Sequence, residues 1–182
     1  MPLSKFVNER LHISDTTRST KQLRPTTKAE LQSIIRQELK QQGPDADLNF
    51  IDTSLITDMQ LLFSGLYIRN IKINEWDVSN VTNMAYMFTD NRTFNCDLSR
   101  WDVSNVTDMS RMFSKCLNFN CDLSHWNTSG VYSMQEMFAD CVKFRSDLSR
   151  WDISKVKYDY DMFIRCPNMR KNTKLQPKFN NA

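Results

Sequence analysis

Residues 101–126 read WDVSNVTDMSRMFSKCLNFNCDLSHW, a stretch that begins and ends on tryptophan. The chain contains four tryptophans, and each lies 25 residues after the one before. Stepping back 25 residues from the first of them reaches Ile51, where IDTSLITDM aligns with the later WDVSNVTNM. Serine and phenylalanine recur with the same period, at Ser54, Ser79, Ser104, Ser129 and Ser154 and at Phe63, Phe88, Phe113, Phe138 and Phe163. Residues 51–166 therefore contain five tandem units, which start at residues 51, 76, 101, 126 and 151.

One unit has an apolar pattern that predicts a strand followed by a short helix. The strand is indicated by Leu98, Trp101 and Val103, because their spacing suits side chains that alternate between two faces. The helix is indicated over residues 107–116, where methionine, phenylalanine and cysteine recur at helical spacing. A single unit cannot bury its apolar face, whereas stacked copies can. The sequence thus predicts an α/β repeat solenoid with right-handed coils and one parallel sheet. The strands are expected to centre near Asp52, Asp77, Asp102, Asn127 and Asp152.

The repeated phrase, written WDVSNVTxMxxMFxxCxxFNxDLSxW, resembles a known family of repeats. It is similar to the BspA-like leucine-rich repeats of bacterial surface proteins, the mycoplasma-type 25-residue repeat, over residues 51–166. The resemblance implies a leucine-rich-repeat fold. It also implies an adhesive or interaction role, since members are mostly described in those terms.

Segments outside the repeats are expected to cover or extend the two ends of the array. Residues 25–50 predict a helical cap, with Thr27 and Glu30 as a capping box and four apolar side chains at helical spacing. Residues 1–24 show no period and are expected to form a flexible segment. Residues 167–182 are expected to form a basic C-terminal tail, after a fifth unit in which the pattern decays.

The five cysteines and the repeated aspartates are the strongest candidates for a metal site. The cysteines form no CxxC pair, and His12 and His125 lie at no ligand spacing, so we expect no metal and no cofactor. Reduced thiols in the core are the expected state of the cysteines. The aspartates recur in two columns at 25-residue intervals, and we expect solvated ladders there rather than a calcium site, because the chain has only three glycines.

The sequence indicates a non-enzymatic protein that binds another protein. It contains no nucleophile elbow and no glycine-rich phosphate loop. A rigid array typically binds through an exposed face, and the outward positions of the units form two charged columns. The expected partner-binding residues are Glu75, Arg100, His125, Arg150, Asp77, Asp102, Asn127 and Asp152. Two forms of this hypothesis remain open, namely an intracellular inhibitor of the phage or mobile-element type and a bacterial surface adhesin.

A contact with nucleic acid through the basic termini is the remaining alternative. Residues 155–182 carry seven basic and two acidic side chains, whereas the net charge of the whole chain is only +3. The residues expected to make this contact are Arg165, Arg170, Lys171, Lys174 and Lys178. No segment is apolar enough to span a membrane, and the N-terminal residues have no signal-peptide pattern. We therefore expect a cytoplasmic protein, with secretion or surface display by another route as the alternative.

Overall fold

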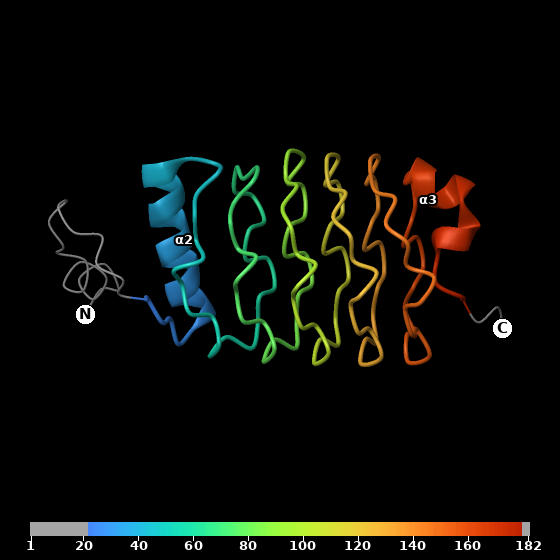
Figure 1. Ribbon diagram of the computed structural model, residues 1–182, viewed down its shortest axis with the longest axis horizontal. Helices are drawn as coiled ribbons and strands as arrows, with labels where there is room; N and C mark the ends of the chain where they lie inside the picture. Colours follow the sequence, from blue (N-terminus) through green and yellow to red (C-terminus); the bar gives the residue numbers. More distant parts are fainter. Residues whose placement is uncertain (1–21, 180–182) are drawn as a thin grey trace, which may run out of the picture.

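The computed structural model describes residues 22–179 as one elongated stack of similar units (Figure 1). Helix α2, Lys28–Gln42, lies at one end of the stack. Helix α3, Pro167–Lys171, and the 3-10 helix η1, Thr173–Leu175, lie at the other. Most of the predicted N-terminal segment, residues 1–21, lies outside the described residues.

The predicted α/β leucine-rich-repeat solenoid with a parallel sheet is wrong. No β-strand occurs among residues 22–179, and no helix occurs between α2 and α3. The units are instead joined by isolated parallel bridges of one residue pair each. The bridges that connect the five units are Asp58 to Asn83, Asn83 to Asp108, Asp108 to Ser133 and Ser133 to Tyr158. The bridging residues are therefore not those around which strands were expected to centre.

Overlapping β-turns replace the helix that was expected over residues 107–116. Backbone N–H groups donate to the carbonyl three residues earlier, from Met112 to Met109 at 3.2 Å and from Cys116 to Phe113 at 2.9 Å. Arg111 and Lys115 have φ values of 53° and 63°, and a positive φ at the third residue is what a type II turn requires. An α-helix cannot continue through such residues. The equivalent residues with positive φ in the other units are Leu61, Gly65, Tyr86, Asp90, Glu136, Asp140, Asp161 and Arg165.

The turns leave alternate backbone N–H groups free to bond the next unit. Met109 donates to the carbonyl of Ser133 at 2.9 Å, and Phe113 donates to that of Met137 at 3.0 Å. Arg111 donates in the same way to Gln135 at 2.8 Å. Because these donors are committed to the neighbouring unit, they are not available for the i to i−4 bonds of a helix. The hydrogen bonds that hold each unit in its turns and the bonds that hold the units together thus use different N–H groups.

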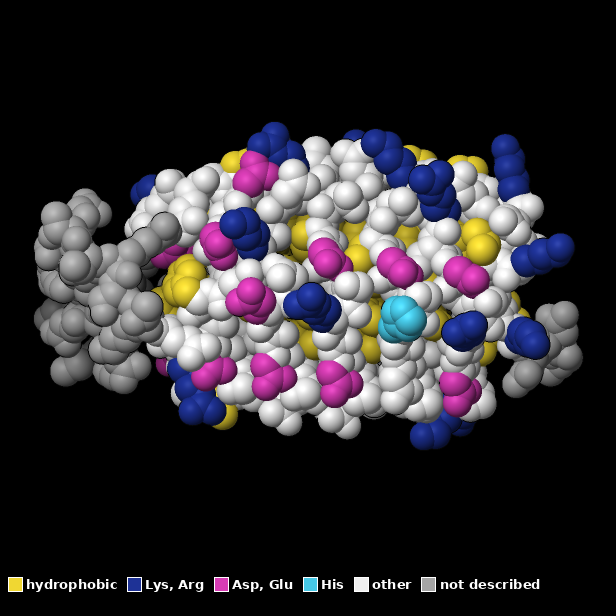
Figure 2. All heavy atoms as spheres, in the orientation of Figure 1, with side chains coloured by type: hydrophobic (Ala, Val, Ile, Leu, Met, Phe, Trp, Pro, Cys, Tyr) yellow, Lys and Arg dark blue, Asp and Glu magenta, His cyan; other side chains and the backbone are white. Residues whose placement is uncertain are grey.

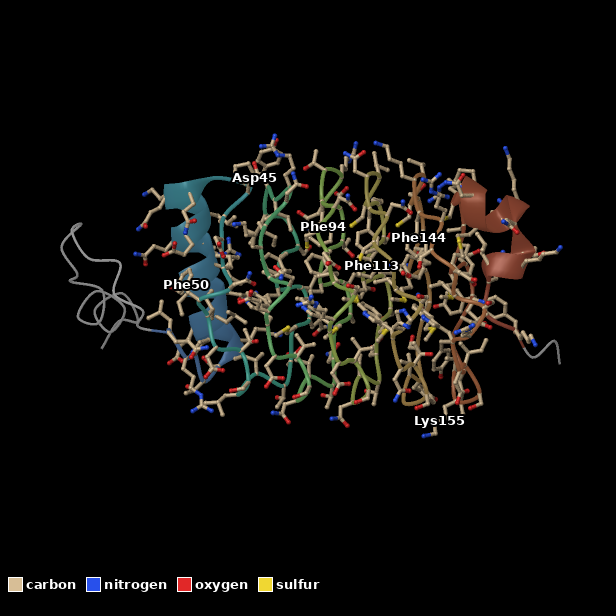
Figure 3. All side chains as sticks on the ribbon, in the orientation of Figure 1. Asp45, Phe50, Phe94, Phe113, Phe144 and Lys155 are labelled. Carbon is tan, nitrogen blue, oxygen red and sulfur yellow. The ribbon has the colours of Figure 1, made fainter. Side chains whose placement is uncertain are left out.

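The apolar positions of each unit form continuous ladders in the core. Phe113 is fully buried, and its ring stacks on Phe88 and on Phe138 at centroid distances of 5.6 Å. The four tryptophans are each 4 % exposed, and the indole Nε1 of Trp101 donates to the carbonyl of Ile73 at 3.0 Å. Figure 3 shows Phe94, Phe113 and Phe144 within the stack, whereas Lys155 extends from its edge.

Helix α2 forms as the sequence predicts. The hydroxyl of Thr27 accepts from the N–H of Glu30 at 3.2 Å, and the Glu30 carboxylate accepts from the N–H of Thr26 at 2.8 Å. Leu31 and Ile35 are fully buried and belong to the same core as the repeats. The helix therefore covers the apolar end of the stack, which would otherwise face water.

Candidate functional site

The two predicted columns lie exposed on one face of the stack, on either side of the buried tryptophans. Glu75, Arg100, His125 and Arg150 precede the tryptophans, and Asp77, Asp102, Asn127 and Asp152 follow them; all eight are exposed. Figure 2 shows rows of acidic side chains on this face, with basic side chains and the histidine in a row between them. We call these eight residues the charged face.

The acidic column of the charged face has a structural role in each turn. The Asp102 carboxylate accepts from the backbone N–H of Ser104 at 3.0 Å, and the Asn127 amide oxygen accepts from Ser129 at 3.2 Å. Such Asx turns fix the backbone locally. The hydroxyl of Ser104 first, and then its backbone N–H, hold the pKa of Asp102 below its usual value. The column therefore stabilises the turns of the fold, whether or not it also contacts a partner.

Replacing Asp102 by alanine should lower the free energy of unfolding by about 1 kcal/mol, because the N–H of Ser104 would lose its acceptor. Ser104→Ala should cost less, since the backbone N–H of residue 104 keeps its acceptor when the hydroxyl is removed. Asp102→Asn should stay near the wild type, as Asn127 holds the equivalent turn. Chemical denaturation of the three variants measures the differences, and a larger loss for Ser104→Ala would contradict this assignment.

The basic residues of the charged face form no ion pair within residues 22–179. Neither Arg100 nor Arg150 takes part in any of the seven ion pairs found there. Arg111, by contrast, is paired with Glu136, and the guanidinium of Arg165 donates to Asp140 at 2.7 Å. The two arginines of the charged face are thus exposed donors whose hydrogen-bonding capacity is not taken up by the adjacent aspartates.

A shallow cavity of about 410 Å³ opens beside the C-terminal half of the charged face. His125 and Arg150 line it, so the structure joins two predicted residues to seven that were not predicted as partner contacts. The seven are Asn120, Cys121, Asp122, Ser124, Arg145, Ser146 and Asp147. The sequence does hold a signal for them, because Arg145 and Ser146 replace the asparagine and cysteine that occupy these positions in the two preceding units.

Ser146 and Asp122 form a small polar network in the wall of the cavity. The Ser146 hydroxyl accepts from the N–H of Leu123 at 2.9 Å and donates to the Asp122 carboxylate at 3.2 Å. The backbone N–H of Ser124 also donates to Asp122 and is the largest cause of the lowered pKa of this carboxyl. These bonds favour the ionised form of the carboxyl, which lines the cavity together with Arg150. After the hydrogen bond in its turn, this cation is a further cause of the lowered pKa of Asp147.

The cysteines form no disulfide and no metal site within the described residues. No group of three or more His, Cys, Asp or Glu side chains there could hold a metal ion. The Sγ of Cys116 donates to the carbonyl of Phe88 at 3.1 Å, and Cys141 donates to Phe113 at 2.9 Å. Burial raises the pKa of the Cys121 thiol to about 11. Protonated, buried thiols of this kind are poor nucleophiles.

All five cysteines should therefore resist alkylation by iodoacetamide at about pH 8 while the protein is folded, because the thiolate is the reactive form. Complete reaction is expected in concentrated guanidinium chloride. Mass spectrometry of the intact protein counts the labelled thiols in both conditions. Cys96 is the internal check, since it is half-buried while the other four are buried. Fast modification of Cys116, Cys141 or Cys166, which are fully buried, would show that the core opens.

The basic residues near the C-terminus are only partly available for nucleic acid. Arg165 is paired with Asp140. The remaining predicted contacts, Arg170, Lys171, Lys174 and Lys178, are exposed and lie on or just beyond α3 and η1. Four cations at one end form a local patch rather than a groove along the stack.

Comparison with known proteins places the repeats in a family. A family model described as Mycoplasma protein of unknown function, DUF285, matches residues 31–129 and again residues 100–181. Neither the curated proteins nor the solved structures include a significant match to the chain. Within residues 22–179, no helix is long and apolar enough to cross a membrane.

Proposed function

The chain belongs to the DUF285 family, and from its surface we propose that it is a non-enzymatic module that binds another protein through the charged face. The observation that carries the proposal is the state of Arg100 and Arg150, which are exposed on a hydrogen-bonded frame and have no ion-pair partner among the described residues. Arginine is enriched among the residues that dominate binding energy at protein interfaces, because its planar fork binds carboxylates and carbonyls with two donors.

The hydrogen-bonded backbone under the charged face supports this role, because it holds the surface in order before a partner binds. The acidic column is held in Asx turns, and each unit is bonded to the next through its backbone. A preordered surface loses less conformational entropy on association. The positions that vary between units, above all Glu75, His125 and Asn127, would then distinguish one partner from another.

We further propose that the units are related to the BspA-like repeats of bacterial surface proteins, which the repeated sequence resembles. Two biological forms of the binding role follow. An intracellular inhibitor would occupy the working surface of its target, and its reduced thiols suit that compartment. A surface adhesin would bind a host or neighbouring cell with the same face.

The proposal is tested by recovering partners with the intact chain from lysate and from surface extracts of the source cell. A protein should be retained by the wild type and lost with the double variant Arg100→Glu, Arg150→Glu. The control is the double variant Arg36→Glu, Lys143→Glu, which changes the net charge equally at exposed positions outside the charged face and its cavity. Equal retention by all three proteins would refute binding through the charged face.

A salt titration separates this proposal from the nucleic-acid alternative. Phosphate contacts make the logarithm of the binding constant fall steeply and linearly with the logarithm of salt concentration. The patch formed by Arg170, Lys171, Lys174 and Lys178 would give such a slope with an oligonucleotide. Strong, steeply salt-dependent binding of an oligonucleotide that survives reversal of Arg100 and Arg150 would favour the alternative.

A further inference from the structure

The last unit of the stack has a row of backbone donors without acceptors. In the unit before it, Met134, Glu136, Phe138 and Asp140 donate their N–H groups to the carbonyls of Tyr158, Tyr160, Met162 and Ile164, at 2.7 to 3.1 Å. The equivalent N–H groups of the last unit belong to Asp159, Asp161, Phe163 and Arg165, and none of them has a hydrogen-bond acceptor within residues 22–179. Unpaired donors in a row are the feature that lets another chain add to the edge of a hydrogen-bonded array.

The C-terminal segment covers only part of this end. The N–H of Leu148, in the fourth unit, donates to the carbonyl of Leu175 at 2.8 Å, so this part of the C-terminal segment bonds the fourth unit and leaves the donors of the last unit uncovered. The ring of Phe179 meets the edge of Phe163 at a centroid distance of 6.4 Å. A cavity of about 600 Å³ lies between the last unit and the C-terminal segment. Its walls are Asp159, Asp161, Met162, Phe163, Ile164, Arg170, Gln176 and Phe179, so the cavity includes three of the four residues with unpaired donors.

The side chains around the cavity combine an apolar floor with unpaired carboxylates. Met162 and Phe163 are 2 % and 7 % exposed and form the floor. Asp159 takes the position that a buried methionine holds in the four earlier units, and it is exposed, as is Asp161. Neither carboxylate has an ion-pair partner among the described residues, and Arg170 is the one cation in the wall.

We propose that this open end, defined by residues 159–165 and the cavity beside them, binds a basic peptide segment of a partner protein as an additional rung of the stack. The backbone carbonyls of the segment would accept from the N–H groups of Asp159, Asp161, Phe163 and Arg165. Its lysine or arginine side chains would meet the two carboxylates, and an apolar side chain would rest on Met162 and Phe163. Main-chain bonds supply affinity in this kind of recognition, and the side-chain contacts supply specificity.

A second copy of the chain does not fit this end. Two copies related by a two-fold axis would place the N–H groups of residues 159–165 against one another, and the carbonyl of Lys157 beside them could not satisfy four donors. Head-to-tail stacking would require the first unit of the second copy to be open, whereas α2 covers it with the buried Leu31 and Ile35. The cavity itself is lined by two carboxylates, Asp159 and Asp161, and by one cation, Arg170, whereas the exposed Lys171, Lys174 and Lys178 are not part of its walls. The local charge of the cavity therefore favours a basic segment of a different chain over an acidic one.

The test uses a capped synthetic peptide of alternating lysine and valine, about ten residues long, and a matched peptide with glutamate in place of lysine. Amide hydrogen exchange of the full chain is followed residue by residue by NMR. The four N–H groups should exchange fast in the free protein and slow down on addition of the lysine peptide. The glutamate peptide should bind about tenfold more weakly or worse. The double variant Asp159→Lys, Asp161→Lys should reverse this preference. Asp159→Lys alone should weaken binding of the lysine peptide and keep the melting temperature of the wild type, because Asp159 is exposed and does not have the positive φ of Asp161.

Three results would overturn the proposal. The first is no binding of the lysine peptide. The second is binding that leaves exchange unchanged at Asp159, Asp161, Phe163 and Arg165, since the contact would then lie elsewhere. The third is equal binding of the lysine and glutamate peptides. Reversal of Arg100 and Arg150 should leave peptide binding intact, which keeps this test independent of the charged face.

Discussion

Replacing Phe113 by alanine should lower the free energy of unfolding by about 3–5 kcal/mol, the largest loss expected from a single substitution in this chain. The ring is fully buried, and it stacks on Phe88, Phe119 and Phe138 at centroid distances of 5.6, 4.1 and 5.6 Å. Its removal leaves a cavity that is walled by other rings, which are themselves held by the backbone bonds between units. Those walls cannot collapse without breaking the bonds, so the cost should lie in the upper part of the range.

Two matched variants are the controls for this measurement. Phe163→Ala removes the same ring from the end of the ladder, where the side chain is 7 % exposed and stacks on only one phenylalanine of the ladder, so it should cost clearly less. Ser104→Ala, on the surface, should cost least. Urea denaturation followed by tryptophan fluorescence reports all three, because the tryptophans are buried in the same core. Equal losses for Phe113→Ala and Ser104→Ala would show that the core and surface positions are assigned wrongly.

The period and the core could be predicted from the sequence, but the local structure of a unit could not. Apolar residues three apart, such as Met109 and Met112, are typical of one face of a helix, so the sequence predicts a helix there. In the structure the same spacing marks the first and last residues of β-turns, for which both ends are buried. The stronger signal was the recurring Asp-x-Ser, since aspartate that bonds the backbone two residues on is typical of turns.

The positions with left-handed backbone conformation carry almost no sequence signal. In one column Gly65, Asp90 and Asp140 are residue types that tolerate positive φ. In the other column, Tyr86 and Arg111 are residue types that rarely adopt a positive φ. Their conformation is imposed by the bonds to neighbouring units, each of which compensates for the local strain, so it depends on contacts 25 residues away. Reasoning over a short window cannot include that contribution.

The sequence predicts only the part of the candidate site that follows from the repeat. The charged face follows from the repeat alone, because equivalent residues of stacked units form a column. The cavity beside it depends on where the repeat is broken, at Arg145 and Ser146. The open end likewise coincides with a break, at Asp159. Departures from the repeat therefore identify surfaces that the repeated residues do not.

Reversing Arg100 and Arg150 together to glutamate should weaken binding of the partner by about tenfold or more, or about 1.4 kcal/mol, while the fold is retained. The fold should tolerate the change because neither guanidinium is ion-paired within residues 22–179 and both are exposed. Binding should weaken, because two guanidinium groups are lost and two negative charges are added beside Asp102 and Asp152.

The affinity of the recovered partner is measured by calorimetry for the wild type, for each single reversal and for the double variant. Similar melting temperatures establish that all four proteins are folded. The competing view is that each arginine merely screens the adjacent aspartates, an interaction between exposed charges that is worth less than about 1 kcal/mol. On that view the double reversal would lower the melting temperature and leave affinity unchanged. Hydrogen bonds in their turns lower the pKa of Asp97 and Asp147 most, and Arg100 and Arg150 lower it further. Neither arginine forms an ion pair within residues 22–179, however, so we expect a small change in melting temperature and the larger loss in binding.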